Sequence, residues 1–461
     1  MLSFIGFLPA IIAFRVALNT SVQTAFMRVY LPTLLLLPEY YRVVMPGLPD
    51  PTFSQGVAVA LLIVALMRGR LQGYRFSHLD AVVGVYAVCV ANSEYQASGY
   101  SDAQNLMFAM LFSVIFPYVM AKSFIEPGGL RFGFPKQVVL CLCALSIINL
   151  YESRFGMNPY QLILGRFFPG QGEGWVVTFR FGMARTAGPF GHALVAGIMM
   201  MVGFRLQRWL QFSAAWPDKI KRFAWLPISV PQFLTLVITG GFFITFAKGS
   251  WLAGFLAGFL VHVGKMKNRV LALLAVLGFV VFIGIPAAMA FIDYASVGRR
   301  NAKDDNQETA CYRYELVIGY IDIAKEKAMW GWGLTKWPQI PAMPSIDNHF
   351  LLLFLMHGQI AFGCFLYILI GTMARLLAHA ARSPPPPRKG ASLAFTLASI
   401  FLGYTVAIAT VYMGGASVPM LFMLVGWAES FMRSNGRDVP PLGAGQPVLA
   451  AAPAFSFRRV V

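Results

Sequence analysis

Apolar runs alternate with short polar segments through most of the chain. Most runs approach the about 20 residues that a bilayer-crossing helix needs, and they lack the short alternating strands of a membrane barrel. The pattern predicts about twelve membrane-spanning helices, at residues 28–46, 54–68, 78–92, 103–121, 136–152, 188–206, 228–246, 249–264, 269–291, 349–373, 391–411 and 414–432. We therefore expect an all-α integral membrane protein.

A long polar interruption breaks this pattern between residues 292 and 348. Inside it, apolar side chains recur at helical spacing and acidic side chains mark the opposite face. The apolar positions are Tyr314, Val317, Ile318, Ile321 and Ala324, and the acidic ones are Glu315, Asp322 and Glu326. The interruption is therefore predicted to contain an amphipathic helix from about Glu308 to Lys327, lying on or against the outer membrane surface.

The two ends of the chain differ from the middle. Over residues 1–25, apolar side chains recur at helical spacing but Arg15 interrupts them, which favours an interfacial amphipathic helix over a span. Residues 26–432 would form the polytopic membrane domain. Residues 433–461, rich in Ala, Pro and Gly, are predicted to be a disordered cytoplasmic tail. The start has no charged segment and no small-residue cleavage site, so no removable signal peptide is expected.

Composition agrees with a membrane protein, since 57% of residues are hydrophobic and only 12% are charged, against about 25% in soluble domains. The 37 Lys and Arg exceed the 19 Asp and Glu, giving a net charge of +18. Most of this excess lies in short loops after every second span, which the positive-inside rule places in the cytoplasm. Nucleic acid is therefore not an expected partner. The segments 153–187 and 292–348 are predicted to face outward, with both termini cytoplasmic.

Metal and nucleotide chemistry find no support in the sequence. Of five cysteines, Cys89, Cys141, Cys143 and Cys364 lie in apolar segments and Cys311 stands alone in the polar interruption. No His and Cys cluster has metal-ligand spacing, and no phosphate-binding glycine loop is present. We expect no metal and no cofactor.

The outward segments nevertheless collect cations, against the orientation rule. They are Arg180, Arg185, Lys248, Arg299, Arg300 and Arg313. Guanidinium groups bind phosphate oxygens in pairs, so these positions suggest an anionic substrate such as a diphosphate at the outer leaflet. For Arg299 and Arg300 the alternative is surface pairing with Asp304 and Asp305.

His349 is the sharpest catalytic candidate, because it stands where the polar interruption meets an apolar helix. A free imidazole has a pKa near 6.5, which suits a general base, and neighbouring Asp347 could orient it. The alternative is an interfacial histidine with its polar tip in water. His357 is expected to be packed. The tryptophans Trp330, Trp332 and Trp337 suit either an interfacial belt or a sugar-stacking platform.

These residues, in this order, resemble the O-antigen ligase and O-antigen polymerase superfamily of bacterial membrane glycosyltransferases. The segment Arg185-Thr186-Ala187-Gly188-Pro189-Phe190-Gly191-His192 resembles its R-x-x-G-x-F-x-H motif, and Thr245-Phe246-Ala247-Lys248-Gly249 its T-x-S-R-G turn. Gly331-Trp332-Gly333 resembles its G-x-G, and Asn348-His349 its H-N exit. Two departures are Lys248 in place of arginine and the reversed order of Asn348 and His349.

The resemblance implies a metal-independent, inverting glycosyl transfer at the periplasmic face of the inner membrane. The donor would be an undecaprenyl-diphosphate-linked glycan, and the partners an acceptor glycan, membrane lipid and a chain-length regulator. His349 would act as the base, while Arg185 and Arg313 would hold the diphosphate. Lys248, Arg180, Asp347, Asn348 and Trp332 would contact the substrates.

The leading hypothesis is a polymerase of O-antigen or exopolysaccharide repeat units. One alternative is a ligase that moves a finished glycan to lipid A-core or to a protein. Another is a lipid-linked glycan flippase or transporter, in which the same cations bind a headgroup without chemistry. Against the last, few charges fall within the spans; Glu39 and Arg42 are exceptions that could pair.

Overall fold

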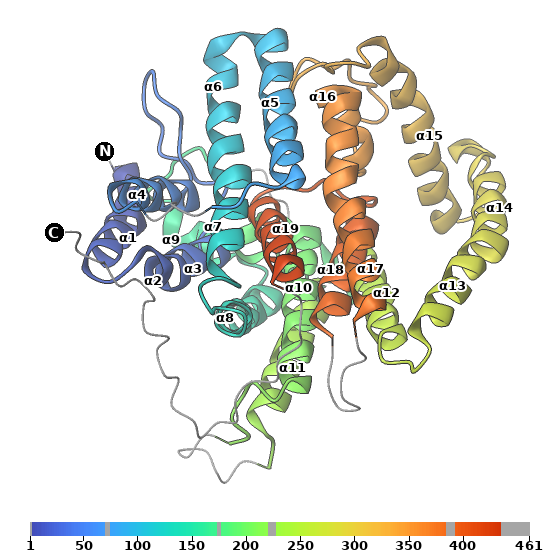
Figure 1. Ribbon diagram of the computed structural model, residues 1–461. Helices are drawn as coiled ribbons and strands as arrows, with labels where there is room; N and C mark the ends of the chain where they lie inside the picture. Colours follow the sequence, from blue (N-terminus) through green and yellow to red (C-terminus); the bar gives the residue numbers. More distant parts are fainter. Residues whose placement is uncertain (1, 70–73, 173–176, 220–226, 384–391, 435–461) are drawn as a thin grey trace.

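The computed structural model describes residues 2–69, 74–172, 177–219, 227–383 and 392–434. Within these residues the protein is almost entirely helical, with one two-stranded hairpin (Figure 1). The helical prediction is therefore confirmed. Residues 435–461, which include nearly all of the predicted tail, lie outside the described part of the chain.

The first half runs from η1 (Leu2–Phe7) through α1 (Leu8–Asn19), α2 (Val22–Ala25), η2 (Phe26–Tyr30), α3 (Leu31–Leu36), α4 (Phe53–Met67), α5 (His78–Ser98), α6 (Tyr100–Ala109), η3 (Met110–Ile115), α7 (Phe116–Phe124), α8 (Gly133–Phe155) and α9 (Pro159–Leu164). The hairpin strands β1 (Phe179–Arg180) and β2 (Met183–Ala184) follow, and then η4 (Gly188–Phe190). Here η marks short 3-10 or π turns.

The second half contains α10 (Ala193–Phe212), α11 (Val230–Phe243), α12 (Lys248–Val263), α13 (Arg269–Phe279), η6 (Val280–Gly284), α14 (Ile285–Ala295), η7 (Arg299–Asn301), α15 (Asp305–Glu326), α16 (His349–Leu366), η8 (Tyr367–Gly371), α17 (Thr372–Arg382), α18 (Leu393–Ile408) and α19 (Ser417–Arg433). Buried side chains of α5, α7, α8, α10, α18 and α19 belong to one large apolar cluster. This cluster is the core of the bundle.

Five helical stretches in the described residues are long and apolar enough to cross a membrane. They are Tyr100–Phe124, Gly133–Phe155, Ala193–Phe212, Arg269–Ala295 and His349–Arg382. Every segment predicted to span contains a helix, but several are shorter, and the first ends at Leu36 instead of residue 46. The full count of crossings stays a prediction.

The stretch Arg269–Ala295 shows the strongest membrane character. It has a mean hydropathy of 2.8, and its most apolar window has no buried residue. α13 and α14 stand at the edge of the molecule (Figure 1), with large apolar side chains such as Leu274, Phe282 and Met289 mostly exposed. Burying such surface is strongly favourable, so a helix of this kind suits contact with lipid.

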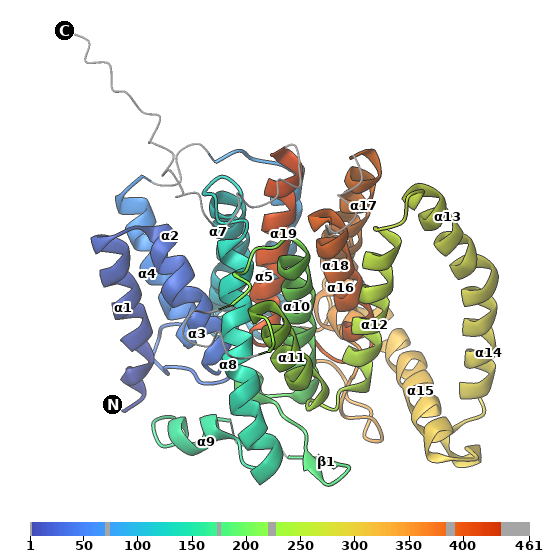
Figure 2. The ribbon, with the colours of Figure 1, turned by 90° about the horizontal axis from the view of Figure 1, so that it is seen from below.

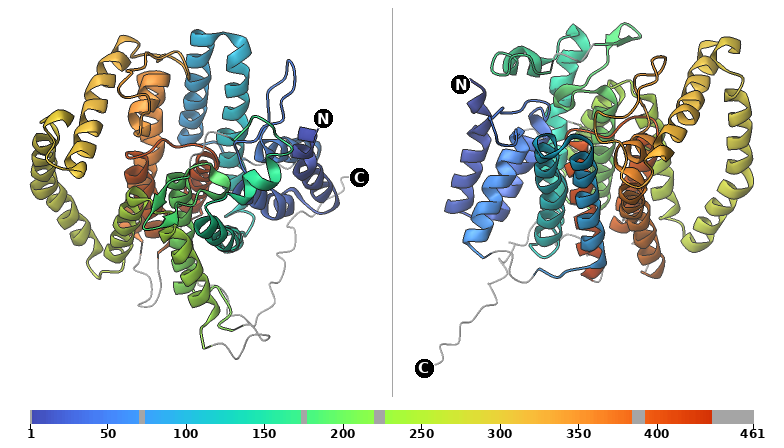
Figure 3. Two further views of the ribbon diagram at one scale, coloured as in Figure 1. Left: turned by 180° about the vertical axis from the view of Figure 1, so that it is seen from behind. Right: turned by 90° about the horizontal axis from the view of Figure 1, so that it is seen from above.

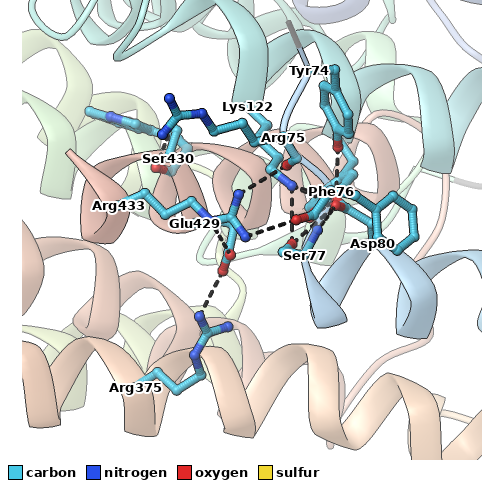
Figure 4. A network of polar contacts seen from close by, with 12 residues as sticks. Tyr74, Arg75, Phe76, Ser77, Asp80, Lys122, Arg375, Glu429, Ser430 and Arg433 are labelled. Atoms are coloured by element: carbon cyan, nitrogen blue, oxygen red, sulfur yellow. Dashed lines mark hydrogen bonds and ion pairs between the residues drawn. The ribbon is translucent and has the colours of Figure 1, made fainter.

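The ends of the bundle differ in charge. One end, which we call the basic end, carries the polar network shown in Figure 4. There Lys122 of α7 pairs with Asp80 of α5 at 2.6 Å. Glu429 of α19 accepts from Arg375 of α17 at 2.8 Å and from Arg433 at 3.1 Å. These contacts neutralise buried carboxylates and join four helices. The loops expected in the cytoplasm begin or end near this network, so the charge pattern and the fold agree.

The opposite end carries α9 and the β1–β2 hairpin, and we call it the hairpin end (Figure 2). The start of the chain also lies there, because a Cβ added at Gly6 would meet Val43 and Phe168. α1 then runs along α4 toward the basic end, where Arg68 donates to the carbonyl of Leu18.

The end of α19 lies at the basic end, where Arg433 donates to the carbonyl of Arg75 at 2.9 Å. The first described residues and the end of α19 therefore sit at opposite ends of the bundle (Figure 3). The side of the membrane on which each terminus lies stays a prediction. α1 packs lengthwise along α4, with Ala13 and Ala17 buried.

The helix predicted at 308–327 is confirmed as α15, which begins at Asp305. Its buried face differs from the predicted stripe. Leu316, Tyr320 and Ala324 are buried, whereas Val317 and Ile318 are 39% and 50% exposed. The face turned toward α16 is thus rotated by about one position from the expected one.

α16 is broken at Gly358, whose φ of 74° and ψ of −179° are not helical. The segment after α15 docks into this break. Gln359 N donates to Ala328 O at 2.7 Å, Trp332 N to Leu355 O at 3.0 Å and Gly333 N to Met356 O at 2.9 Å. The backbone groups freed by the break are thereby satisfied, as groups away from water must be.

Gly358→Ala should destabilise the protein strongly. A Cβ there would sit 2.3 Å from Met329 O, and the backbone conformation alone costs an alanine about 1–3 kcal/mol. Gly363→Ala in the same helix is the matched control, since a Cβ at Gly363 meets nothing within 4 Å. Thermal unfolding of the purified proteins in detergent measures both. Equal unfolding temperatures for the two variants would contradict the docked break.

The chain ends should react with a reagent from opposite sides of the membrane. In a variant without native cysteines, Ser3→Cys should be labelled by a membrane-impermeant maleimide in intact cells. Ser434→Cys should be labelled only after the membrane is permeabilised. Labelling of both positions from the same side would show that α1 does not run the length of the bundle.

Candidate functional site

The hairpin end brings together several predicted outward cations. β1 and β2 are joined by Phe181-Gly182, both with positive φ, a geometry that closes tight hairpins. Arg180 lies on β1, and its Nη1 donates to the carbonyl of Phe246 at 2.8 Å. This bond ties the hairpin to the connection between α11 and α12, where Lys248 follows.

Glu152, in the last turn of α8, fixes the segment after the hairpin. Its fully buried carboxylate accepts from Ala187 N at 3.1 Å, from Gly188 N at 2.8 Å and from Asn158 Nδ2 at 3.3 Å. Gly188 has a φ of +57°, and a Cβ there would lie 2.8 Å from the Asn149 amide oxygen. The chain from Arg185 to His192 therefore has one anchored path.

Arg185 is half-buried, and its Nε makes no hydrogen bond within the described residues. Burial lowers the pKa of this guanidinium, and the nearby charge of Arg180 lowers it further. Neither arginine forms an ion pair with a carboxylate in the described part of the chain. Two neighbouring cations that form no ion pair among the described residues favour an anionic ligand.

His192 belongs to the same cluster and caps α10, its Nδ1 accepting from Leu194 N at 3.2 Å. Burial lowers the pKa of His192 and so does Arg185, whereas Asp347 opposes them. The neutral form is favoured, and because Nδ1 accepts, the proton of this form resides on Nε2. His192 is thus arranged as a hydrogen-bond donor.

Lys248 is exposed at the first turn of α12. Its turn lies close to the connection between α18 and α19, since a Cβ at Gly249 would meet the Thr410 hydroxyl. Arg313 is also exposed, on α15, and forms no hydrogen bond or ion pair among the described residues. The structure therefore places Lys248 beside Arg180 through the Phe246 turn, while Arg313 lies on a separate helix.

The expected pairing of Arg299 and Arg300 with Asp304 and Asp305 is not found for Arg299. Its Nε donates to Glu315 at 2.8 Å. Asp304 instead caps α15 by accepting from Gln307 N at 2.7 Å. Asp304 is therefore used as the N-cap of α15, and Arg299 pairs with Glu315 of the same helix.

His349 is not at a water boundary, as the sequence suggested, but buried with 9% of its surface exposed. Its ring packs edge-on against Phe365 with centroids 5.4 Å apart. Neither ring nitrogen has a hydrogen-bond partner in the described residues. Buried polar atoms are almost always paired, so this exception marks a side chain to explain.

Asn348 and Asp347, the residues before His349, make other contacts than those predicted. Asn348 caps α16, its side-chain oxygen accepting from Phe350 N and Leu351 N. Asp347 is exposed, and its carboxylate lies 3.4 Å from the Ser345 hydroxyl and not against His349. Because Asn348 turns the chain into the helix, residues 347 and 349 face different surroundings.

His357 and Trp332 are packed. His357 is buried, and its Nδ1 lies 2.6 Å from the Ser93 hydroxyl, as expected of a helix-contacting residue. Trp332 donates from Nε1 to Ile323 O at 2.9 Å, and Lys327 covers its ring at 4.2 Å. The ring of Trp332 therefore helps to hold α15 to the docked segment instead of standing open as a sugar platform.

Two features of this end were not found from the sequence. One is Glu152, which could have been noticed because it is an acidic residue near the end of an apolar run. The other is a cavity of about 330 Å³ lined by Glu39 and Tyr40, beyond the end of α3. Among the described residues, no three His, Cys, Asp or Glu side chains are grouped so as to hold a metal ion.

Comparison of the chain with known protein families and with curated proteins found no match. The fold and the cluster at the hairpin end define an all-helical protein with candidate membrane spans and an uncompensated cationic site.

Glu152→Gln should loosen the segment that carries Arg185 and His192. Glutamine keeps one acceptor oxygen and sets an NH₂ group against backbone donors, while each hydrogen bond to a charged group contributes about 1.5–3 kcal/mol. We expect a lower unfolding temperature and faster tryptic cleavage after Arg185 in the native protein. Glu326→Gln, at an exposed site on α15, is the control. Unchanged cleavage after Arg185 would refute the anchoring role.

Proposed function

We propose that this protein is a glycosyltransferase of the bacterial inner membrane that polymerises undecaprenyl-diphosphate-linked repeat units at the periplasmic leaflet. The observation that carries the proposal is the pair Arg180 and Arg185, which lack a carboxylate partner in the described residues. A diphosphate supplies the charge that this pair lacks. The order of motifs shared with the O-antigen ligase and polymerase superfamily supports the same substrate.

In the proposed reaction, an acceptor sugar hydroxyl attacks the anomeric carbon of the donor sugar. Its proton passes to His349, and the bond to the diphosphate breaks with its electrons leaving on the undecaprenyl diphosphate. Arg185 and Arg313, with Lys248, stabilise the charge that develops on the leaving group. The unpartnered nitrogens of His349 support its role as base. Its burial implies that the acceptor reaches it only when the docked segment or α16 shifts.

A ligase would use the same donor and the same cluster, with lipid A-core or a protein as acceptor. A flippase would use the cations without chemistry. The unpartnered imidazole of His349 favours the two transferases over the flippase, because a protein that only binds and moves a headgroup transfers no proton and needs no buried base.

Arg185→Lys and His349→Ala should each reduce polymer in a strain deleted for its own copy. Lysine keeps the charge but lacks the planar guanidinium that can make two hydrogen bonds to a phosphate. Loss of such a bidentate contact, about 1.5–3 kcal/mol, lowers the rate roughly tenfold or more. Loss of a general base costs about 10²–10⁴-fold. Surface glycan is measured by gel at equal protein levels, with exposed Arg300→Lys as the control.

The form of the residual glycan separates the alternatives. A polymerase defect leaves surface glycan with one repeat unit or none, whereas a ligase defect leaves long chains on the lipid carrier. A flippase defect traps single repeats on the cytoplasmic side. Normal glycan length and yield from His349→Ala would remove the general base from the mechanism.

A further inference from the structure

The cavity at the hairpin end is formed by segments far apart in the sequence. A volume of about 330 Å³ is lined by Glu39, Tyr40, Arg42, Gln161 of α9, Gly172, residues 189–191, Tyr412 and Gly415. Gly191 is the residue before His192, so the cavity adjoins the cationic cluster. Ligand pockets span about 300–1,000 Å³, which makes this one large enough for a sugar-sized ligand.

The lining has two kinds of surface. Tyr40, Tyr412 and Pro189 offer rings, and Glu39, Gln161 and Arg42 offer acceptors and donors of hydrogen bonds. A sugar presents an apolar ring face and a rim of hydroxyl groups that both donate and accept. Aromatic rings with a few convergent polar groups match that chemistry.

Glu39 carries the argument further. Its Oε2 accepts from the Thr52 hydroxyl at 2.8 Å, at the start of α4. Its Oε1 is buried and has no hydrogen-bond partner in the described residues. Burial raises the pKa of this carboxyl, and the Thr52 hydroxyl, the hydroxyl and backbone amide of Ser54 and the charge of Arg42 oppose that shift only in part. A buried acceptor without a donor is costly, so the cavity is incomplete without a ligand that donates.

Charge separates this cavity from the neighbouring cluster. Arg180 and Arg185 attract a diphosphate, whereas this cavity is lined by one acidic and one basic side chain, Glu39 and Arg42. The Tyr160 hydroxyl, on α9 next to the cavity residue Gln161, is also buried without a partner in the described chain. Neutral hydroxyl-rich ligands and anionic ligands therefore have different places at this end of the bundle.

We propose that this cavity binds the acceptor sugar, with Glu39 Oε1 accepting a hydrogen bond from a sugar hydroxyl and Tyr412 packing against the ring. The inference rests on the proposed glycosyltransferase function. It adds a division of the site, in which Glu39, Tyr40, Arg42 and Tyr412 hold the acceptor and the arginine cluster holds the donor diphosphate.

Two probes test this division on the purified full-length protein. One is the repeat oligosaccharide released from the host's surface glycan by mild acid, which has no diphosphate. The other is undecaprenyl diphosphate, which has no sugar. Glu39→Ala and Tyr412→Ala should weaken oligosaccharide binding about tenfold or more and leave undecaprenyl diphosphate binding within about twofold. Arg185→Lys should show the reverse pattern.

Asp102→Ala and Tyr100→Ala are the matched controls. Both residues are exposed at the start of α6, which lies at the same end because Asn105 accepts from Asp50 N at 2.8 Å, and neither lines the cavity. Tyr412 is 45% exposed, so its replacement tests the cavity even where Glu39→Ala does not fold.

The outcomes distinguish this inference from the function on which it rests. Failure of the wild-type protein to bind the oligosaccharide, or unchanged binding by both cavity variants, overturns the acceptor site. Loss of both probes in Glu39→Ala and Tyr412→Ala overturns the division. If Arg185→Lys keeps undecaprenyl diphosphate binding and normal glycan, the proposed function itself fails. If only the Arg185 result is as expected, the function stands and the acceptor site falls.

Discussion

The requirement that buried backbone groups be hydrogen-bonded governs this structure most visibly at the break in α16. A helix interrupted at Gly358 leaves amides and carbonyls without partners, and the segment 328–333 supplies them. That docking fixes α15 beside α16 and sets the direction in which residues 347–349 leave the polar segment. The position of His349 is therefore a consequence of backbone pairing in another part of the chain.

The two ends of the bundle treat charge in opposite ways. At the basic end, buried Asp80 and Glu429 are paired with lysine and arginine, and these contacts bind helices together. At the hairpin end, Arg180 and Arg185 are held in place by a carbonyl and by the anchored turn, without a paired carboxylate among the described residues. The paired charges at the basic end stabilise the fold, whereas the arginines at the hairpin end that lack a carboxylate partner among the described residues can bind a ligand.

Much of the fold followed from periodicity, because a helix needs only local hydrogen bonds and an apolar face. α15 was expected within a few residues, but the sequence did not show whether Leu316 or Val317 is buried against the protein, since both are apolar and only α16 decides between them. The cations at Arg180 and Arg185 were found because they oppose the orientation rule. Glu152 and the cavity at Glu39 were missed, because their partners lie in distant segments.

The sequence by itself determined an all-helical, strongly apolar chain with short basic loops and one long polar, cation-bearing segment. These properties depend on composition and spacing, which act locally. The tertiary structure alone decided that α1 runs along α4, that His349 is buried against Phe365, and that Arg180 is tied to the turn before α12. Such facts depend on which helices pack together, and packing of apolar faces is too unspecific to be read from a pattern.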